Sequence, residues 1–172
     1  MLLQRWHEKQ KHLRESLQNT RIYGIFGEKI FNHLLWKNDK RAIAGGLSLG
    51  LFIAFTPTIP FQMLLATGGA LLLRVNLPIA LAACWITNPL TVVPIYMSAW
   101  KLGRYVVDNF VVMEEVLRLY ALRTRSARFI QQTIYLWIGS LIYAVTAALG
   151  ANIVVRVLWR SISKIVDARA DK

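Results

Sequence analysis

The sequence is poor in the residues that catalysis and metal binding require. It has one cysteine, Cys84, so neither a disulfide framework nor a thiolate metal site is available. Its histidines, His7, His12 and His33, all precede the first apolar stretch, and none has a partner at metal-ligand spacing. It also lacks a glycine-rich phosphate loop that leads to a Lys, and it has no Ser, His and acid set that the geometry would obviously unite. We therefore expect no metal, no cofactor and no enzymatic activity.

Acidic residues are also scarce, with 9 Asp and Glu against 21 Lys and Arg, a net charge of +12. A basic chain can bind nucleic acid, but no helix-turn-helix spacing, zinc ligands or aromatic RNA-binding motif is present. The charges lie beside apolar stretches, where they are better explained as cytoplasmic flanks that attract anionic lipids. We expect membrane lipids as partners and no nucleic acid.

Three stretches lack any charged residue: residues 42–73, 75–100 and 129–155. Each is longer than the roughly 20 residues that cross the ~30 Å hydrocarbon core of a bilayer. A chain of 172 residues could not cover three such helices inside a soluble core. The predicted fold is an all-α integral membrane protein with proline-broken, re-entrant helices and basic amphipathic helices at the membrane interface.

Four regions follow from this pattern. Residues 1–40 are predicted to form two amphipathic helices, and residues 41–103 a membrane domain with two broken segments. Residues 104–128 are predicted as an interfacial helix, and 129–172 as a third membrane segment with a basic tail. Membrane-surface helices are favoured for residues 1–40 over helices packed on a partner protein. Their apolar stripes are Leu3, Trp6, Leu13 and Leu17, then Tyr23, Phe26, Ile30 and Leu34.

The first membrane stretch is interrupted near its middle by Pro57 and Pro60. As one straight helix, residues 42–73 would measure about 48 Å, well beyond the bilayer core. Two prolines remove two backbone donors and push the preceding residues away from helical geometry. We expect two half-helices that meet at a polar break, after a helix start capped by Asn38 or Asp39.

The second stretch has a similar interruption, with Pro89 and Pro94 as predicted helix-break residues. Irregular backbone at membrane depth survives only where protein or water satisfies its polar groups. The two breaks should therefore face each other or a cavity. The predicted substrate-binding residues are those at the breaks and at the turn between the stretches: Thr56, Thr58, Gln62, Arg74, Asn76, Asn88 and Thr91. The alternative is that the prolines only kink the helices.

Small residues recur every four positions in two of the stretches. One ridge is Ala42, Gly46, Gly50 and Ala54, and the other is Ser140, Ala144, Ala148 and Asn152. Such ridges predict close helix contacts. The number of crossings stays open: three single crossings would leave the basic tail outside, against the positive-inside tendency. A re-entrant hairpin at Pro57 and Pro60 is favoured, and the side of the C-terminus is left undecided.

The central region resembles a family of bacterial membrane proteins, the domain of unknown function 2062. The matching motifs lie between about residues 41 and 103: Ala44-Gly45-Gly46-Leu47-Ser48-Leu49-Gly50-Leu51-Phe52, Pro57 with Pro60-Phe61-Gln62, Arg74-Val75-Asn76-Leu77-Pro78, Thr87-Asn88-Pro89-Leu90-Thr91 and Leu102-Gly103. The resemblance implies the bacterial cytoplasmic membrane. Occurrence of related domains beside glycosyltransferases hints at lipid-linked sugars. The resemblance to this family implies no established activity.

Two functions are expected from these features. The first is a protein of the bacterial inner membrane, with its N-terminus in the cytoplasm, that binds or translocates an amphiphilic or anionic substrate such as a lipid or lipid-linked intermediate. Its site would be the polar breaks, with Arg74 meeting the negative group. The alternative is a structural or assembly subunit, as a homo-oligomer or with another membrane protein, that docks through its small-residue ridges.

Overall fold

The computed structural model describes residues 21–109 and 125–170, and every regular element in these ranges is helical. The all-helical fold is therefore confirmed for the described part of the chain. The first predicted amphipathic stripe and most of the predicted 104–128 helix lie outside the described residues. In chain order the elements are α2 (Arg21–Phe26), the 3-10 helices η1 (Gly27–Phe31) and η2 (His33–Trp36), α3 (Lys40–Phe55), α4 (Gln62–Leu73), α5 (Leu77–Cys84), α6 (Val92–Asn109) and α8 (Arg125–Ala170).

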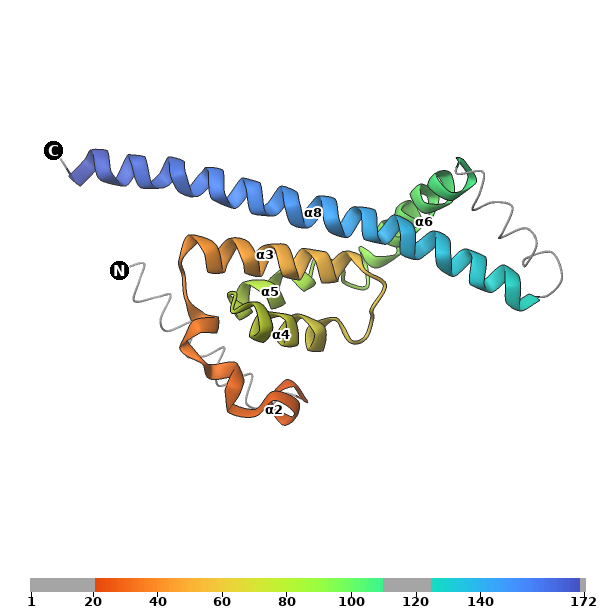
Figure 1. Cartoon of the computed structure of the whole chain (residues 1–172), viewed down its shortest axis with the longest axis horizontal. Helices are drawn as coiled ribbons and strands as arrows, with labels where there is room; N and C mark the ends of the chain where they lie inside the picture. Colours follow the sequence, from red (N-terminus) through yellow and green to blue (C-terminus); the bar gives the residue numbers. More distant parts are fainter. Residues whose placement is uncertain (1–20, 110–124, 171–172) are drawn as a thin grey trace.

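The first break separates α3 from α4, as predicted. Asp39 caps α3, its Oδ1 accepting the Ala42 N–H at 2.7 Å. The helix ends at Phe55, residues 56–61 form the first loop with Pro57 and Pro60, and α4 begins at Gln62. The chain then returns to its starting level, because the Asn76 N–H donates to the Ala42 carbonyl at 3.0 Å. Residues 42–73 thus form a hairpin of two half-helices (Figure 1).

The second break lies between α5 and α6, in a second loop of residues 85–91 that contains Pro89. Pro94, predicted as a break residue, instead lies in the first turn of α6. A proline is tolerated there because the first N–H groups of a helix have no intrahelical acceptor. The same helix runs on to Asn109, so the predicted boundary between residues 103 and 104 falls inside one continuous element.

The predicted second amphipathic helix is divided into α2, η1 and η2. Gly27 has φ +57°, a left-handed conformation that ends α2. Beyond it, Ile30 is fully buried, and the Trp36 indole donates to the Ile30 carbonyl at 2.9 Å. These side chains pack with Val75 and Leu77. Part of the apolar side of this segment is therefore covered by the chain's own α4–α5 turn, and its place at the membrane surface stays a prediction.

Both small-residue ridges lie at close helix contacts, as predicted. In α3 the ridge is buried, and a Cβ added at Gly46 or Gly50 would meet the backbone carbonyl of Asn76 or Ala80. In α8 the ridge lies against the opposite side of α3, where Ser48 Oγ donates to the Ala148 carbonyl at 2.9 Å. Each ridge therefore brings two backbones together, which is how helices associate when apolar burial contributes little.

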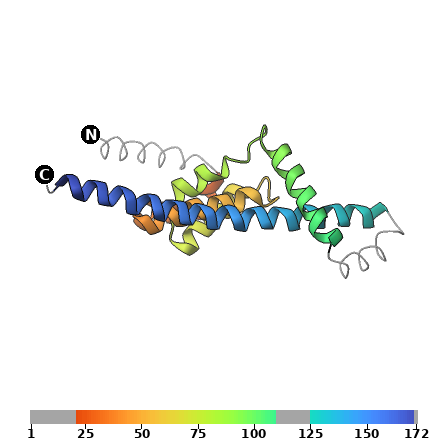
Figure 2. The ribbon, with the colours of Figure 1, turned by 90° about the horizontal axis from the view of Figure 1, so that it is seen from above.

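Helix α8 forms the long axis of the molecule, and α3 runs antiparallel to it (Figure 1). The Phe55 ring meets the Tyr143 ring edge to face, with centroids 6.1 Å apart. Helix α6 crosses α8 further along, where Gly103 and Gly139 face each other (Figure 2). A Cβ on either glycine would strike the backbone of the other helix, so this crossing requires glycine on both sides.

Within the described residues, one helix is long and apolar enough to cross a membrane by length and composition, over the 33 residues Arg128–Arg160. Only 6% of its apolar window is buried inside the chain, so most of its side chains face outward. The other two predicted membrane stretches are each divided between two shorter helices.

Candidate functional site

Three side chains and one backbone carbonyl, from four segments, meet where the two loops approach each other. Gln62, the first residue of α4, is 8% exposed, and its Oε1 accepts from Thr87 Oγ1 at 3.3 Å. Its Nε2 donates to the Ala54 carbonyl at 3.3 Å and to Tyr96 Oη at 3.4 Å. Tyr96 Oη donates in turn to the Thr56 carbonyl at 2.8 Å. We call Thr56, Gln62, Thr87 and Tyr96 the polar junction.

The hydrogen bonds of the polar junction differ in length. Hydrogen bonds in proteins usually join heavy atoms at about 2.5–3.2 Å. The Tyr96–Thr56 bond at 2.8 Å is within that range, whereas all three bonds of the Gln62 side chain are longer. The Gln62 amide is therefore the group that a ligand could most easily recruit.

A pocket of about 190 Å³ opens beside the polar junction. Its polar lining comes from Gln62, Thr87 and Asn88, and its apolar lining from Met63, Cys84, Trp85 and Pro89. Pockets for complete small-molecule ligands usually measure roughly 300–1,000 Å³. This pocket can therefore hold the polar end of a larger molecule but not a whole drug-sized ligand.

Asn88 and Thr91 form a local turn in the second loop. Asn88 Oδ1 accepts the N–H groups of Leu90 at 2.9 Å and Thr91 at 3.1 Å. Thr91 Oγ1 accepts the Asn88 N–H at 3.0 Å and donates to the Ile86 carbonyl. Asn88 reaches the pocket, but Thr91 is not among its lining residues. Its hydroxyl is occupied in shaping the turn.

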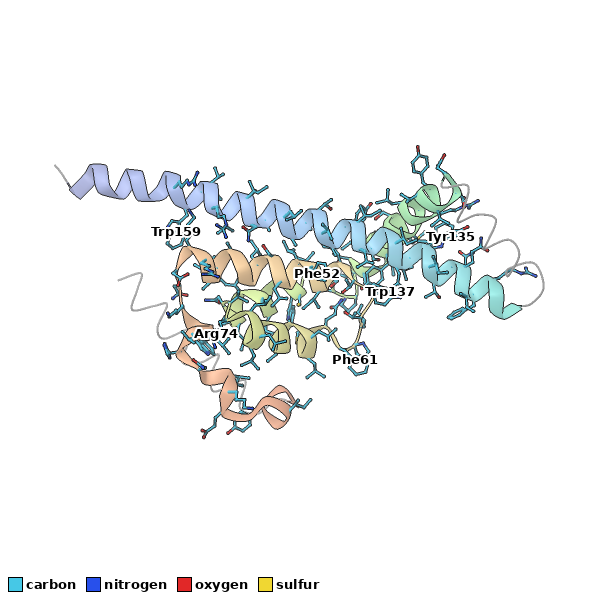
Figure 3. The ribbon with its side chains drawn as sticks, viewed as in Figure 1. Phe52, Phe61, Arg74, Tyr135, Trp137 and Trp159 are labelled. Carbon is cyan, nitrogen blue, oxygen red and sulfur yellow. The ribbon has the colours of Figure 1, made fainter. Side chains whose placement is uncertain are left out.

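The other predicted site residues are distributed unevenly. Thr58 lies beside Thr56, with hydroxyl oxygens 3.4 Å apart, but does not line the pocket. Arg74 and Asn76 follow the far end of α4, whose 12 residues rise about 18 Å. Figure 3 shows Arg74 at one end of α4 and Phe61 at the other. The structure thus brings Thr56, Thr58, Gln62 and Asn88 together and leaves Arg74 and Asn76 apart.

Asn76 has a structural environment that the sequence reasoning did not anticipate. Its side chain is fully buried, and Oδ1 caps α5 by accepting the Ile79 N–H at 3.0 Å. Its Nδ2 donates to the Lys37 carbonyl at 2.7 Å and to Asn38 Oδ1 at 3.2 Å. Arg74, by contrast, is exposed and ends α4 in a left-handed conformation at φ 54°.

Sequence reasoning missed Thr87 and Tyr96. Thr87 immediately precedes the Asn88-Pro89 pair, so its place at the break could have been noticed. Tyr96 lies in a stretch that looks uniformly apolar, and its only signal is the hydroxyl that a buried tyrosine has to satisfy. Among the described residues, no three His, Cys, Asp or Glu side chains gather closely enough to hold a metal ion.

Large apolar side chains are exposed on both loops around the pocket. Phe61 in the first loop is 60% exposed, and Trp85 and Leu90 in the second are 67% and 87% exposed. Ile59 and Ile86 are exposed beside them. A cluster of large apolar side chains of this kind marks a surface that contacts protein or lipid.

In its described residues the protein is all-helical, with one helix long and apolar enough to cross a membrane and a pocket of mixed polar and apolar lining between two loops. The chain belongs to the family described as "Uncharacterized protein conserved in bacteria (DUF2062)", whose model matches residues 24–165. The resemblance is thereby confirmed over a longer stretch than the motifs cover, and the protein is bacterial. No curated protein and no solved structure matches the chain.

Proposed function

We propose that the chain is an integral protein of the bacterial cytoplasmic membrane whose polar junction binds the polar end of an amphiphilic or anionic ligand. Lipids and lipid-linked intermediates belong to this class. Helices α3 and α4 form a re-entrant hairpin, α5 and α6 together cross the bilayer, and α8 crosses back. The role is binding or translocation, without catalysis.

The observation that carries the proposal is the level of the two loops along α8. Phe55, the last residue of α3, meets Tyr143, which is next to the midpoint of the candidate span Arg128–Arg160. When α8 crosses a bilayer, the loops lie near its middle. Backbone at that depth has to be satisfied by protein or enclosed water, and the polar junction provides such partners. The exposed apolar side chains of both loops suit the same depth.

The lengths of the half-helices agree with a hairpin that enters and returns. Half of a ~30 Å hydrocarbon core is about 15 Å, and the 12 residues of α4 rise about 18 Å. Helix α4 therefore reaches the middle from one surface but cannot cross. The turn at Arg74 and Asn76 then lies near the surface at the level of Lys37 and Asn38, where Asn76 bonds both residues.

The proposed topology also distributes the basic residues between the two sides of the membrane. The start of α3, the end of α4, the start of α5 and the C-terminal part of α8 lie on one side of the membrane. The end of α6 and the start of α8 lie on the other side. Among the described residues, the first side carries ten basic residues: five before Ala42, Arg74, and four from Arg156 to Arg169. The other side carries four between Lys101 and Arg128. The positive-inside tendency therefore supports both termini in the cytoplasm.

Cysteine accessibility in intact cells tests this topology. In a Cys84→Ala background, which has no other cysteine, we expect Asn109→Cys to react with a membrane-impermeant maleimide from outside. Lys40→Cys and Arg156→Cys should react only after permeabilisation. Phe61→Cys at the hairpin tip should react slowly under both conditions. Labelling of Phe61→Cys from outside as fast as Asn109→Cys would show that the hairpin crosses the membrane.

Ligand retention tests the binding site. After purification in mild detergent, native mass spectrometry should find an anionic lipid or lipid-linked molecule on the wild type and at least about tenfold less on Gln62→Leu, since an interaction worth 1.4 kcal/mol is tenfold in affinity. Thr67→Val is the matched control, because Thr67 is buried in the same helix and bonds only the Met63 carbonyl. Equal retention by wild type, control and Gln62→Leu would contradict binding at the junction.

A structural or assembly role is the second candidate, and the outer face of α8 supports it. Leu141, Val145, Leu149 and Ile153 are all more than 40% exposed on that face, and Gly150 has open space around it. Small and apolar residues of this kind pack against helices of other membrane subunits. A partner present in equal amounts after mild purification, with no retained lipid, would favour this role.

A further inference from the structure

An open groove of about 520 Å³ lies between α6 and α8. It is lined by Val92, Val93, Tyr96, Met97 and Trp100 of α6 and by Leu136 of α8. We call it the α6–α8 groove. Its volume lies within the roughly 300–1,000 Å³ that complete ligands occupy.

The groove has an apolar surface although two of its lining residues carry polar atoms. Tyr96 Oη is directed to the Thr56 carbonyl, and Trp100 Nε1 donates to Gln132 Oε1 at 2.8 Å. Both polar atoms are thus bonded outside the groove, which leaves the two ring surfaces to line it. An occupant needs no hydrogen-bonding group along this length, and water there would find no partners.

The ends of the groove differ. Tyr96 belongs to the polar junction and Val92 directly follows the second loop, whereas the Arg104 guanidinium lies 5.7 Å from the centroid of the Trp100 ring at the outer end. From Val92 to Trp100, α6 rises about 12 Å, close to the ~15 Å depth of one leaflet. The groove therefore extends from the level of the loops to a cation near the membrane surface.

We propose that the α6–α8 groove holds one acyl chain of a phospholipid from the leaflet opposite the two termini, with the lipid phosphate on the side of Arg104. This inference rests on the proposed membrane insertion but not on ligand binding at the polar junction. The occupant is a lipid tail because the lining is apolar and the length matches a leaflet. The charged residues at the outer end are Lys101 and Arg104, with Asp108 paired to Arg104 at 3.2 Å, and their net positive charge suits a phosphate.

Electron paramagnetic resonance of spin-labelled phosphatidylglycerol tests the proposal, with the full chain in phosphatidylethanolamine and phosphatidylglycerol vesicles. The wild type should show a motionally restricted component beyond that of the general lipid shell. Met97→Trp, whose position is 57% exposed in the groove, should lose restricted signal equal to about one lipid per chain. Val93→Trp, at a neighbouring position 59% exposed, repeats the test.

Leu149→Trp is the matched control, because Leu149 is 60% exposed on α8 away from the groove, and it should retain the full restricted signal. Flotation of each variant with the vesicles reports insertion separately. Inserted chains whose restricted signal is equal in Met97→Trp and Leu149→Trp overturn the groove proposal and leave the proposed topology intact. Disulfide formation between two Met97→Cys chains, in the Cys84→Ala background, would also overturn it, because a second copy would then occupy the groove.

Discussion

An amide side chain lies near each end of α4, Gln62 at its first residue and Asn76 just beyond its last, and the two amides are held very differently. Asn76 is fully buried, with bonds of 2.7–3.2 Å to a helix start, a carbonyl and a second amide. Gln62 has bonds of 3.3–3.4 Å and lies next to a pocket. Similar chemistry thus serves a rigid turn at one end and an exchangeable contact at the other. The contrast suggests which end is built for stability and which for a ligand.

Gly46→Ala should cause the largest loss of stability, because it alters the packing at Asn76, near the end of α4. The new Cβ would meet the Asn76 backbone carbonyl, which cannot move without shifting the start of α5. We expect about 3 kcal/mol of destabilisation, the upper part of the usual range for overpacking. Thermal unfolding in mild detergent, followed by circular dichroism, measures it.

Gly150→Ala is the control for that substitution, since Gly150 is also helical but has nothing within 4 Å of an added Cβ. It should be neutral or stabilising by up to about 1 kcal/mol, the helix-propensity difference between the two residues. Equal effects at Gly46 and Gly150 would mean that α3 and α5 do not pack as closely as described.

Asn76→Ala should cause the next largest destabilisation, about 2–3 kcal/mol. It removes the cap of α5 and leaves the Lys37 carbonyl and the Ile79 N–H without their side-chain partner. The same unfolding measurement applies, with Asn38→Ala as control because it removes one bond of the cluster and keeps the cap. A loss no greater than that of Asn38→Ala would contradict a stabilising role for Asn76.

The smallest effect on stability should come from Gln62→Leu, at about 1 kcal/mol or less. Two of its three partners keep other bonds, because Thr87 Oγ1 still donates to the Cys84 carbonyl and Tyr96 Oη still donates to the Thr56 carbonyl. The third, the Ala54 carbonyl, loses a bond that is long, at 3.3 Å. The comparison would fail if Gln62→Leu unfolded as readily as Asn76→Ala in the same detergent. The polar junction would then stabilise the fold in the same way as the Asn76 hydrogen bonds do.

Much of the backbone could be predicted from local sequence. Pro57, Pro60 and Pro89 act on their own chain segment, so the loops they occupy follow from proline chemistry. The small-residue ridges could also be predicted, because helical spacing places their residues on one face of the helix. Pro94 misled the prediction because the effect of proline depends on whether a helix begins before or after it.

The site was less predictable, because it depends on contacts between distant segments. Tyr96 reaches Thr56 across 40 positions, and nothing in the composition around Tyr96 marks it. Asn76 carries the signature of a polar residue between two apolar stretches, which suits a ligand site and a helix cap equally. Only the positions of Lys37 and Asn38 distinguish the two roles.

The bond from Ser48 to the Ala148 carbonyl has a consequence for biosynthesis. The donor is in α3 and the acceptor is in α8, 100 positions later. A ribosome delivers the α3–α4 hairpin before α8 has been made, so the hydroxyl of Ser48 and the face of α3 around it gain their partner only after α8 is synthesised. Truncation before residue 148 should therefore leave the hairpin without its supporting helix.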